Sequence, residues 1–167
     1  ESALTFQDFS ELVTNETSCS DVSTTELKEM FNAIDHNHDG KIQLDDIADL
    51  LKSKTIEFSR RSLGEEPRRE IYLADTLGEL GLFYRLSRLA FIGGSMGMHG
   101  GHNPIEAASL NCAIMHGPDM GNFKAVADEL HNAGGAVIVD SPETLADAVG
   151  RFLSDTSMME HVTAAAG

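Results

Sequence analysis

The stretch that decides the fold of the longer part of this chain is "FIGGSMGMHGGHNPIEAA", residues 91–108. A short apolar run leads into a loop rich in glycine and histidine, and the loop ends at Asn-Pro before a helical pattern. Asn103 is a favourable N-cap and Pro104 a favourable first helical residue. Helix N-termini present unpaired N–H groups, and glycines let a ligand approach the backbone. The stretch therefore predicts a strand, an anion-binding loop and a helix in succession.

The carboxylate that follows this loop has two interpretations. Glu106 falls at the third position of the expected helix, so it could form a capping box with Asn103. Alternatively, Glu106 could accept hydrogen bonds from ribose hydroxyls while the loop amides hold a phosphate. The spacing alone leaves both alternatives open.

Apolar runs and helical patterns alternate on both sides of this loop. We expect strands at residues 71–75, 89–94, 112–117 and 136–140, and helices at residues 78–89, 104–110, 122–134 and 142–155. Strands that alternate with helices are typical of parallel sheets with crossover connections. This part of the chain therefore predicts an α/β fold.

The first third of the chain has a different composition. Residues 1–55 carry 12 acidic and 4 basic side chains, no proline and a single glycine, Gly40. The other 14 glycines and all four prolines lie beyond residue 55. We therefore expect two domains, residues 1–55 and 56–167.

The segment "DHNHDGKIQLDD", residues 35–46, has the spacing of a calcium loop. Oxygen-bearing side chains fall at loop positions 1, 3, 5 and 12, and a glycine falls at position 6, where the backbone must turn sharply. Oxygen-only ligands suit a hard cation, Ca²⁺ or, as a competitor, Mg²⁺. The expected ligands are Asp35, Asn37, Asp39, the carbonyl of Lys41, and Asp46.

With its amphipathic flanks, this segment resembles the EF-hand family over residues 24–54, which implies an all-α helix-loop-helix. Residues 1–13 resemble the second half of another hand, so Leu4 is expected to pair with Ile42. One departure is Asp46, where the family has Glu: the shorter side chain reaches the ion less easily, which would weaken calcium binding. The alternative is a decayed loop that keeps the shape without binding.

Five motifs in the longer part occur in one order: "SRRSLGEEP", "IYLADTLGELGLFYRLSRLAFIGGS", "HGGHNPIEAA", "CAIMHGP" and "NF". Together they resemble the C-terminal, donor-binding domain of the 3-deoxy-D-manno-octulosonic acid (Kdo) transferases of bacterial lipopolysaccharide synthesis, over about residues 58–152. The resemblance implies a Rossmann-like partial domain, half of a two-Rossmann glycosyltransferase fold. Such enzymes transfer Kdo from CMP-Kdo to a lipid A precursor at the cytoplasmic face of the inner membrane.

The resemblance also implies which residues bind the donor. They are Arg61, Leu77, Gly78, Glu79, Ser95, His99, Gly101, Asn103 and Glu106. It implies no cofactor for this segment and no catalytic residue, because the family's catalytic base lies in its N-terminal domain. We therefore expect a fragment or fusion related to Kdo transferase that binds CMP-Kdo or CMP and is inactive alone, so its status as an enzyme is open.

The alternative function is that of a calcium-binding EF-hand protein with an inert α/β passenger. The formal net charge of −15 argues against nucleic-acid binding in either case. No apolar stretch approaches the roughly 20 residues of a membrane span, and the polar start predicts no signal peptide. We therefore expect a cytoplasmic protein. A lipid A precursor is an expected partner only of a complete enzyme, and an exposed sheet edge predicts self-association.

Overall fold

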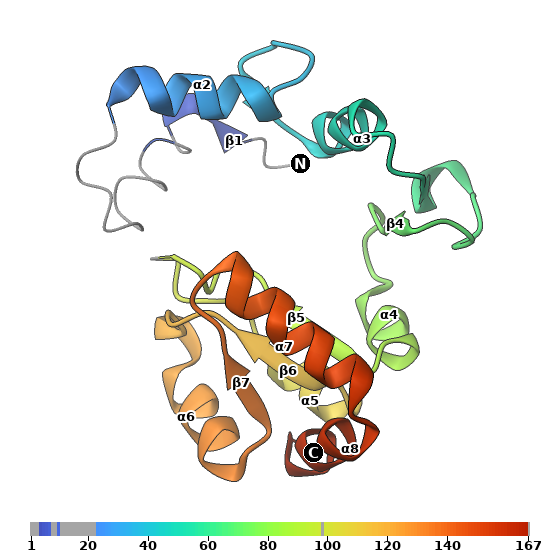
Figure 1. Ribbon diagram of the computed structural model, residues 1–167, viewed down its shortest axis with the longest axis vertical. Helices are drawn as coiled ribbons and strands as arrows, with labels where there is room; N and C mark the ends of the chain where they lie inside the picture. Colours follow the sequence, from blue (N-terminus) through green and yellow to red (C-terminus); the bar gives the residue numbers. More distant parts are fainter. Residues whose placement is uncertain (1–3, 8–9, 11–22, 98, 167) are drawn as a thin grey trace. The chain divides into compact units, whose positions relative to one another are not determined.

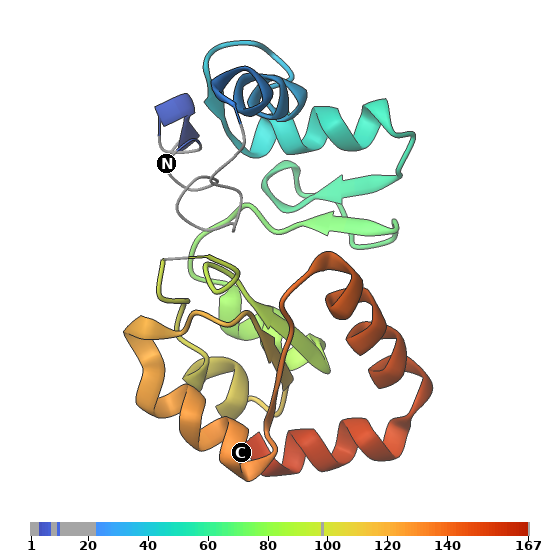
Figure 2. The same ribbon diagram turned by 60° about the vertical axis from the view of Figure 1, so that its left-hand side comes forward.

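The computed structural model describes residues 4–7, 10, 23–97 and 99–166 (Figures 1 and 2). The chain is mixed α/β, as expected, and it forms two compact units, residues 1–77 and 78–167. The predicted domain boundary at residues 55–56 lies between the segment that resembles an EF-hand and the segment that resembles Kdo transferases. The compact units divide at residues 77–78 instead, and the domain boundary stays a prediction. Among the described residues, no helix has the length and apolar character that crossing a membrane requires.

The first unit begins with the helix-loop-helix. Helix α2 (Thr24–Ile34) starts in a capping box between Ser23 and Glu26, and α3 (Leu44–Ser53) follows the acidic loop. Strands β1 (Leu4–Thr5) and β2 (Lys41–Ile42) pair antiparallel, with Leu4 opposite Ile42. The predicted pairing of these two residues is confirmed. The same pairing adds two-residue strands to a segment that was expected to be all-α.

The first unit ends in two further strands. Strand β3 (Phe58–Arg60) runs parallel to β4 (Ile71–Leu73), with the short 3-10 helix η1 (Arg61–Leu63) between them. The expected strand at residues 71–75 is confirmed in β4. Strand β3 includes the start of the "SRRSLGEEP" motif, where buried Ser59 donates to the Glu66 carbonyl at 2.9 Å.

The second unit is built on a three-stranded parallel sheet with the order β5-β6-β7. Every strand and helix expected between residues 78 and 155 is present. The elements are α4 (Leu80–Leu86), β5 (Leu89–Ile92), α5 (Ile105–Ser109), β6 (Ala113–His116), η2 (Gly121–Phe123), α6 (Lys124–Ala133), β7 (Ala136–Ile138), α7 (Pro142–Ser154) and α8 (Thr156–Ala166). The last helix, α8, was not expected, because its apolar residues form only a weak stripe among alanines.

Helices cover both faces of this sheet. Alternate residues of the fully buried strand β6 point to opposite faces: Ile114 packs with residues of α5 and α6, and Met115 packs with residues of α7 and α8. Figure 1 shows α7 lying across one face of the sheet, with α5 behind it. The carboxyl ends of β5 and β6 lead into the loops at residues 93–104 and 117–123. In open α/β sheets, ligands bind at this edge.

Candidate functional site

The glycine-rich loop after β5 closes on itself through its backbone. The Gly101 amide donates to the Gly94 carbonyl at 2.9 Å, and the His102 amide donates to the Gly93 carbonyl at 3.0 Å. Gly94 and Gly101 have φ angles of 68° and 69°, in the left-handed region that favours glycine. The density of glycines in this motif therefore follows from the turn itself.

The loop after β6 packs directly against the glycine loop. Ser95 is fully buried; its hydroxyl donates to the Ile92 carbonyl and accepts from the Gly117 amide at 2.7 Å. A Cβ atom on Gly117 would lie 2.0 Å from the Ser95 carbonyl oxygen, so the two loops touch without room for a side chain. The Ser95 hydroxyl, predicted to bind the donor, is engaged within the protein.

A capping box between Asn103 and Glu106, one of the two interpretations of this stretch, does not form at the start of α5. The helix begins at Ile105 with Pro104 as its N-cap, one residue later than expected, and no side chain caps it. The Asn103 side chain instead accepts from the Ile105 amide at 2.9 Å, a local turn that Asn commonly makes. The capping-box interpretation is therefore wrong.

The Glu106 carboxylate lies beside the helix that follows the "DTLGE" motif. A Cβ atom on Gly81, in the first turn of α4, would lie 3.0 Å from Glu106 Oε1. Glu106 is exposed, and within the described part of the chain no group donates a hydrogen bond to its carboxylate. Burial, with a smaller contribution from the charge of Glu106, raises the pKa of Tyr84 on the same helix. The structure thus brings the "HNPIE" motif close to the first turn of α4.

Several amides of the glycine loop are engaged within the chain. Besides those of Gly101 and His102, the Gly100 amide donates to Asp119 Oδ2 at 2.7 Å, and the Ile105 amide donates to Asn103. An anion at this loop must therefore displace one of these bonds or use other groups. This differs from the expectation of a loop whose amides await a phosphate.

The remaining predicted donor-binding residues are spread over both units. Arg61, half-buried in η1, and the fully exposed Leu77 belong to residues 1–77. Gly78, with φ of 82°, and Glu79, the N-cap of α4, open the second unit, and His99 is exposed in the glycine loop.

Sequence reasoning missed the strongest ion pair of the first unit. The Arg60 guanidinium contacts the carboxylates of Asp75 and Asp45, and Asp75 also accepts from the amide and hydroxyl of Ser62 at 2.8 and 2.7 Å. Arg60 and then Ser62 hold the pKa of Asp75 well below its usual range, and the same pairing raises the pKa of Arg60. The signal was present, because Arg60 lies in "SRRS" and Asp75 opens "DTLGE".

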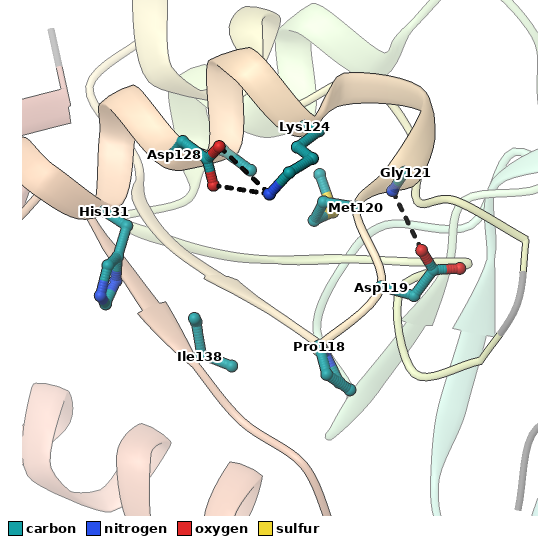
Figure 3. A pocket seen from close by; sticks show the side chains of 9 residues that line it. Pro118, Asp119, Met120, Gly121, Lys124, Asp128, His131 and Ile138 are labelled. Atoms are coloured by element: carbon teal, nitrogen blue, oxygen red, sulfur yellow. Dashed lines mark hydrogen bonds and ion pairs between the residues drawn. The ribbon is translucent and has the colours of Figure 1, made fainter.

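A cavity of about 210 Å³ lies beside the amino end of α6. Figure 3 shows its apolar wall, Pro118, Met120 and Ile138, facing the Lys124–Asp128 ion pair and His131. The volume is below the roughly 300–1,000 Å³ of typical ligand pockets. None of the predicted donor-binding residues lines this cavity, so it is not the predicted site.

His116 ends the central strand of the sheet. Its Nδ1 lies 2.7 Å from the Gly117 carbonyl oxygen, and among the described residues its buried Nε2 has no hydrogen-bond partner. Nδ1 must carry the proton to make that bond, which leaves Nε2 as an acceptor. The ring therefore orients the turn at Gly117.

In the acidic loop, two buried carboxylates bind backbone amides. Asp35 accepts from the Asp39 and Gly40 amides at 3.2 and 2.9 Å. Asp46, which is fully buried, accepts from the His36, Asn37 and Gln43 amides at 3.1, 3.3 and 2.8 Å. The loop thus keeps its shape through its own side chains.

The donor types and spacing of this loop fit a hard cation, but its carboxylates do not converge. Both oxygens of Asp46 face backbone amides, and the described residues contain no group of three or more acidic, His or Cys side chains placed to hold a metal. Of the other predicted ligands, Asn37, Asp39 and Lys41 are exposed. Calcium binding would therefore require the loop carboxylates to move closer together.

Comparisons with known proteins give results for both parts of the chain. The family model described as an EF-hand domain matches residues 26–60. The 3-deoxy-D-manno-octulosonic acid transferase of Haemophilus influenzae is 39% identical over 119 residues, which is 70% of this chain and 28% of the relative. The transferase of Bordetella pertussis is 31% identical over 127 residues, covering 74% and 30%. The chain thus spans less than a third of these relatives.

A solved structure extends the likeness to the fold. The C-terminal CMP-Kdo binding domain of WaaA from Acinetobacter baumannii superposes with a TM-score of 0.68 at 31% identity, covering 73% of this chain and 65% of that one. Both resemblances found in the sequence are therefore confirmed: about 70% of the chain is similar to part of the Kdo transferases, and residues 26–60 match an EF-hand domain.

Proposed function

We propose that this chain binds a CMP-activated sugar, CMP-Kdo, as a fragment or fusion related to Kdo transferase. The observation that carries the proposal is the likeness, over 73% of the chain, to a domain named for CMP-Kdo binding. We further propose that residues 78–167 are part of a Rossmann-like domain, one of two in a complete glycosyltransferase. Their parallel sheet, with helices on both faces, supports this assignment.

Within this proposal, Glu106 accepts hydrogen bonds from the ribose hydroxyls. Its support is that the carboxylate is exposed, has no donor within the described residues and lies over Gly81. The turn before α4 supplies Leu77, Gly78 and Glu79, and Arg61 faces the cytidine or its phosphate. Asn103 is the second main polar contact to the nucleotide, and Ser95, His99 and Gly101 belong to the same donor-binding loop.

Calorimetric titration with CMP tests this proposal. A hydrogen bond to a charged group contributes about 1.5–3 kcal/mol, so Glu106→Ala should weaken CMP binding by about 10- to 150-fold. Glu129→Ala removes the same charge from an exposed position on α6 and should leave the affinity unchanged. A folded chain that does not bind CMP, or a Glu106→Ala variant that binds it normally, would refute the proposal.

We propose donor binding without transfer for this chain alone. Transfer requires donor and acceptor to be aligned, and the chain spans only 28% of the Haemophilus influenzae relative. No CMP should be released when the chain is mixed with CMP-Kdo and a lipid A precursor, whereas a complete transferase should release it. The lipid A precursor and a place at the cytoplasmic face of the inner membrane belong to the proposal only for a complete enzyme.

A second candidate function is calcium binding by the acidic loop. The EF-hand match and the Leu4–Ile42 pairing favour it, and Asp35, Asn37, Asp39, the Lys41 carbonyl and Asp46 would hold the ion. Because Asp46 is shorter than the Glu that the family has at this position, we expect weak binding with Mg²⁺ as a competitor. Calorimetry with Ca²⁺ should show heat that Asp35→Asn removes and Asp49→Asn, a change outside the loop, retains. No heat from the unaltered chain would identify a decayed loop.

We also propose self-association through a sheet edge. Within the described residues β7 pairs only with β6, and Ile138 on β7 is 48% exposed. Unpaired edges are ready templates for another strand. Sedimentation should detect a concentration-dependent dimer, which a lysine at position 138 should abolish; a monomer at all concentrations would end the proposal.

A further inference from the structure

Two polar side chains of the loop after β6, those of Asp119 and Asn122, form hydrogen bonds with the glycine loop. Asp119 spans two amides: its Oδ2 accepts from Gly100 at 2.7 Å and its Oδ1 accepts from Gly121 at 3.0 Å. Figure 3 shows the second of these bonds. The carboxylate therefore links the glycine loop to the turn that begins η2.

Asn122 also forms hydrogen bonds with this part of the glycine loop, through both its backbone amide and its side chain. Its amide donates to the Gly100 carbonyl at 2.9 Å, and its side-chain Nδ2 donates to the His99 carbonyl at 2.7 Å. A Cβ atom on Gly100 would lie 2.6 Å from Asn122 Cγ. The Asn122 amide group thus fills the space that a side chain at Gly100 would need.

These contacts restrain two residues that would be conformationally free in an unrestrained chain. Gly100 and Gly101 are consecutive left-handed residues, with φ of 75° and 69°. Glycine loses more conformational freedom on ordering than any other residue. A loop that is ordered before the ligand arrives does not have to be ordered by it, which improves affinity.

Asp119 also bears on where an anion can bind. Its carboxylate occupies the Gly100 amide, so a phosphate is excluded from that donor by both the hydrogen bond and like charge. An anion at this loop must therefore use donors other than the Gly100 amide.

We propose that Asp119 and Asn122 are positioning residues for the nucleotide-sugar donor: they fix residues 99–101 in the binding conformation without touching the donor. This inference rests on the proposed CMP-Kdo binding. It adds two residues from the loop after β6 to a site otherwise drawn from "DTLGE" and "HGGHNPIE".

The test combines CMP titration with amide hydrogen exchange and thermal unfolding of the full chain. Asn122→Asp keeps the side chain's size but replaces the Nδ2 donor with an acceptor facing the His99 carbonyl. We expect the dissociation constant for CMP to rise about 5- to 30-fold and the amides of Gly100 to His102 to exchange faster, with little change in melting temperature. Asn132→Asp, an exposed position on α6, is the matched control and should change neither.

The Asp119 variants should give a graded response. Asp119→Asn keeps one acceptor oxygen and Asp119→Ala keeps none, so the loss of CMP affinity should be larger for Ala. A merely structural role would lower the melting temperature in the same order but leave the CMP affinity of the folded fraction unchanged.

The outcomes separate the two proposals. If the unaltered chain fails to bind CMP although its loop amides are protected, the proposed function falls and this inference falls with it. If the unaltered chain binds CMP and all four loop variants bind it equally well, with Asn122→Ala as the fourth, the donor site stands and the positioning role is overturned. Unchanged exchange at Gly100 in Asn122→Asp would also overturn the role, because the hydrogen bonds would not be restraining the loop.

Discussion

The acidic loop at residues 35–46 and the glycine loop at residues 93–103 differ in where the groups that stabilise their turns come from. Both must hold a tightly turned backbone, and both use carboxylates as acceptors for its amides. In the acidic loop the acceptors, Asp35 and Asp46, belong to the loop itself. In the glycine loop the acceptor is Asp119, which comes from the loop after the next strand. The first loop is closed locally, whereas the second depends on the sheet that brings its neighbour close.

The largest effect expected from this difference is at Gly117, where the two loops of the second unit touch. In Gly117→Ala the new Cβ would meet the Ser95 carbonyl oxygen at 2.0 Å and the Ser95 carbonyl carbon at 2.4 Å, and backbone cannot yield as a side chain can. We expect a loss of about 3 kcal/mol in the free energy of unfolding, the upper end of the range for overpacking, measured by chemical denaturation. Nuclear magnetic resonance should show the loss in residues 78–167, with the acidic loop unaffected.

The control for this variant is Gly150→Ala. Gly150 lies in α7 with nothing within 4 Å of an added Cβ, so the variant should gain about 0.5–1 kcal/mol from helix propensity. A Gly117→Ala variant as stable as the parent chain would show that the contact between the two loops is not required.

The same difference explains what the sequence could and could not predict. The acidic loop's residues and its flanking helices follow from local spacing, as do the strands and helices of the second unit up to α7, whereas the Leu4–Ile42 pairing was predicted from the resemblance to an EF-hand. Asp119 and Asn122 act on Gly100 from about 20 positions away. Asn122 lies in the "NF" motif, but neither the motif nor the local spacing shows that these two side chains contact Gly100 and its neighbours. The spacing also could not decide between a capping box at Asn103 and Glu106 and a free Glu106 carboxylate. Asn103 could equally make a turn one residue before the helix, and the spacing did not exclude it.

Asp46→Ala tests the local closure of the acidic loop. The variant removes the acceptor for three partly buried amides, those of His36, Asn37 and Gln43. Because these donors lose their partner, we expect a loss of about 2 kcal/mol in the free energy of unfolding and faster exchange of the three amides. Asp49→Ala makes the same charge change at a surface ion pair with Lys52 and should cost well under about 1 kcal/mol. Equal effects of the two changes would mean that the charge, not the amide bonds, matters.

Asp75 is a third carboxylate that accepts from a backbone amide, that of Ser62, and it also pairs with the Arg60 guanidinium. Its contribution to the stability of the fold should depend on pH. Because Arg60 and Ser62 lower the pKa of Asp75 in the folded state, its contribution is fully present above the unfolded value of about 3.9. It is lost as the pH falls below that value towards the folded pKa. Melting curves between pH 2 and 6 should therefore show a smaller acid-induced loss of stability for Asp75→Asn than for the parent chain. Parallel curves for the two proteins would show that the pair does not form.

The smallest effect should come from Gly40, the single glycine of the acidic loop. Its φ of 83° requires a left-handed residue, but an added Cβ would meet nothing within 4 Å. Gly40→Ala should therefore cost only the backbone strain, about 1–2 kcal/mol, and Gly40→Asn less, because Asn visits this region routinely. Gly64→Ala, at φ of 72° and equally open, should cost the same outside any metal loop.

Gly101 in the glycine loop allows the cost of backbone strain to be distinguished from the cost of a steric clash. It has a similar φ of 69°, but an added Cβ would lie 2.4 Å from Met120 Sδ. Gly101→Ala should therefore cost more than Gly40→Ala, and Asn at position 101 should give no relief, because relaxing the backbone does not remove the clash. If Asn were tolerated equally well at both positions in thermal unfolding, the two loops would differ only in their sequences and not in how closely their neighbours enclose them.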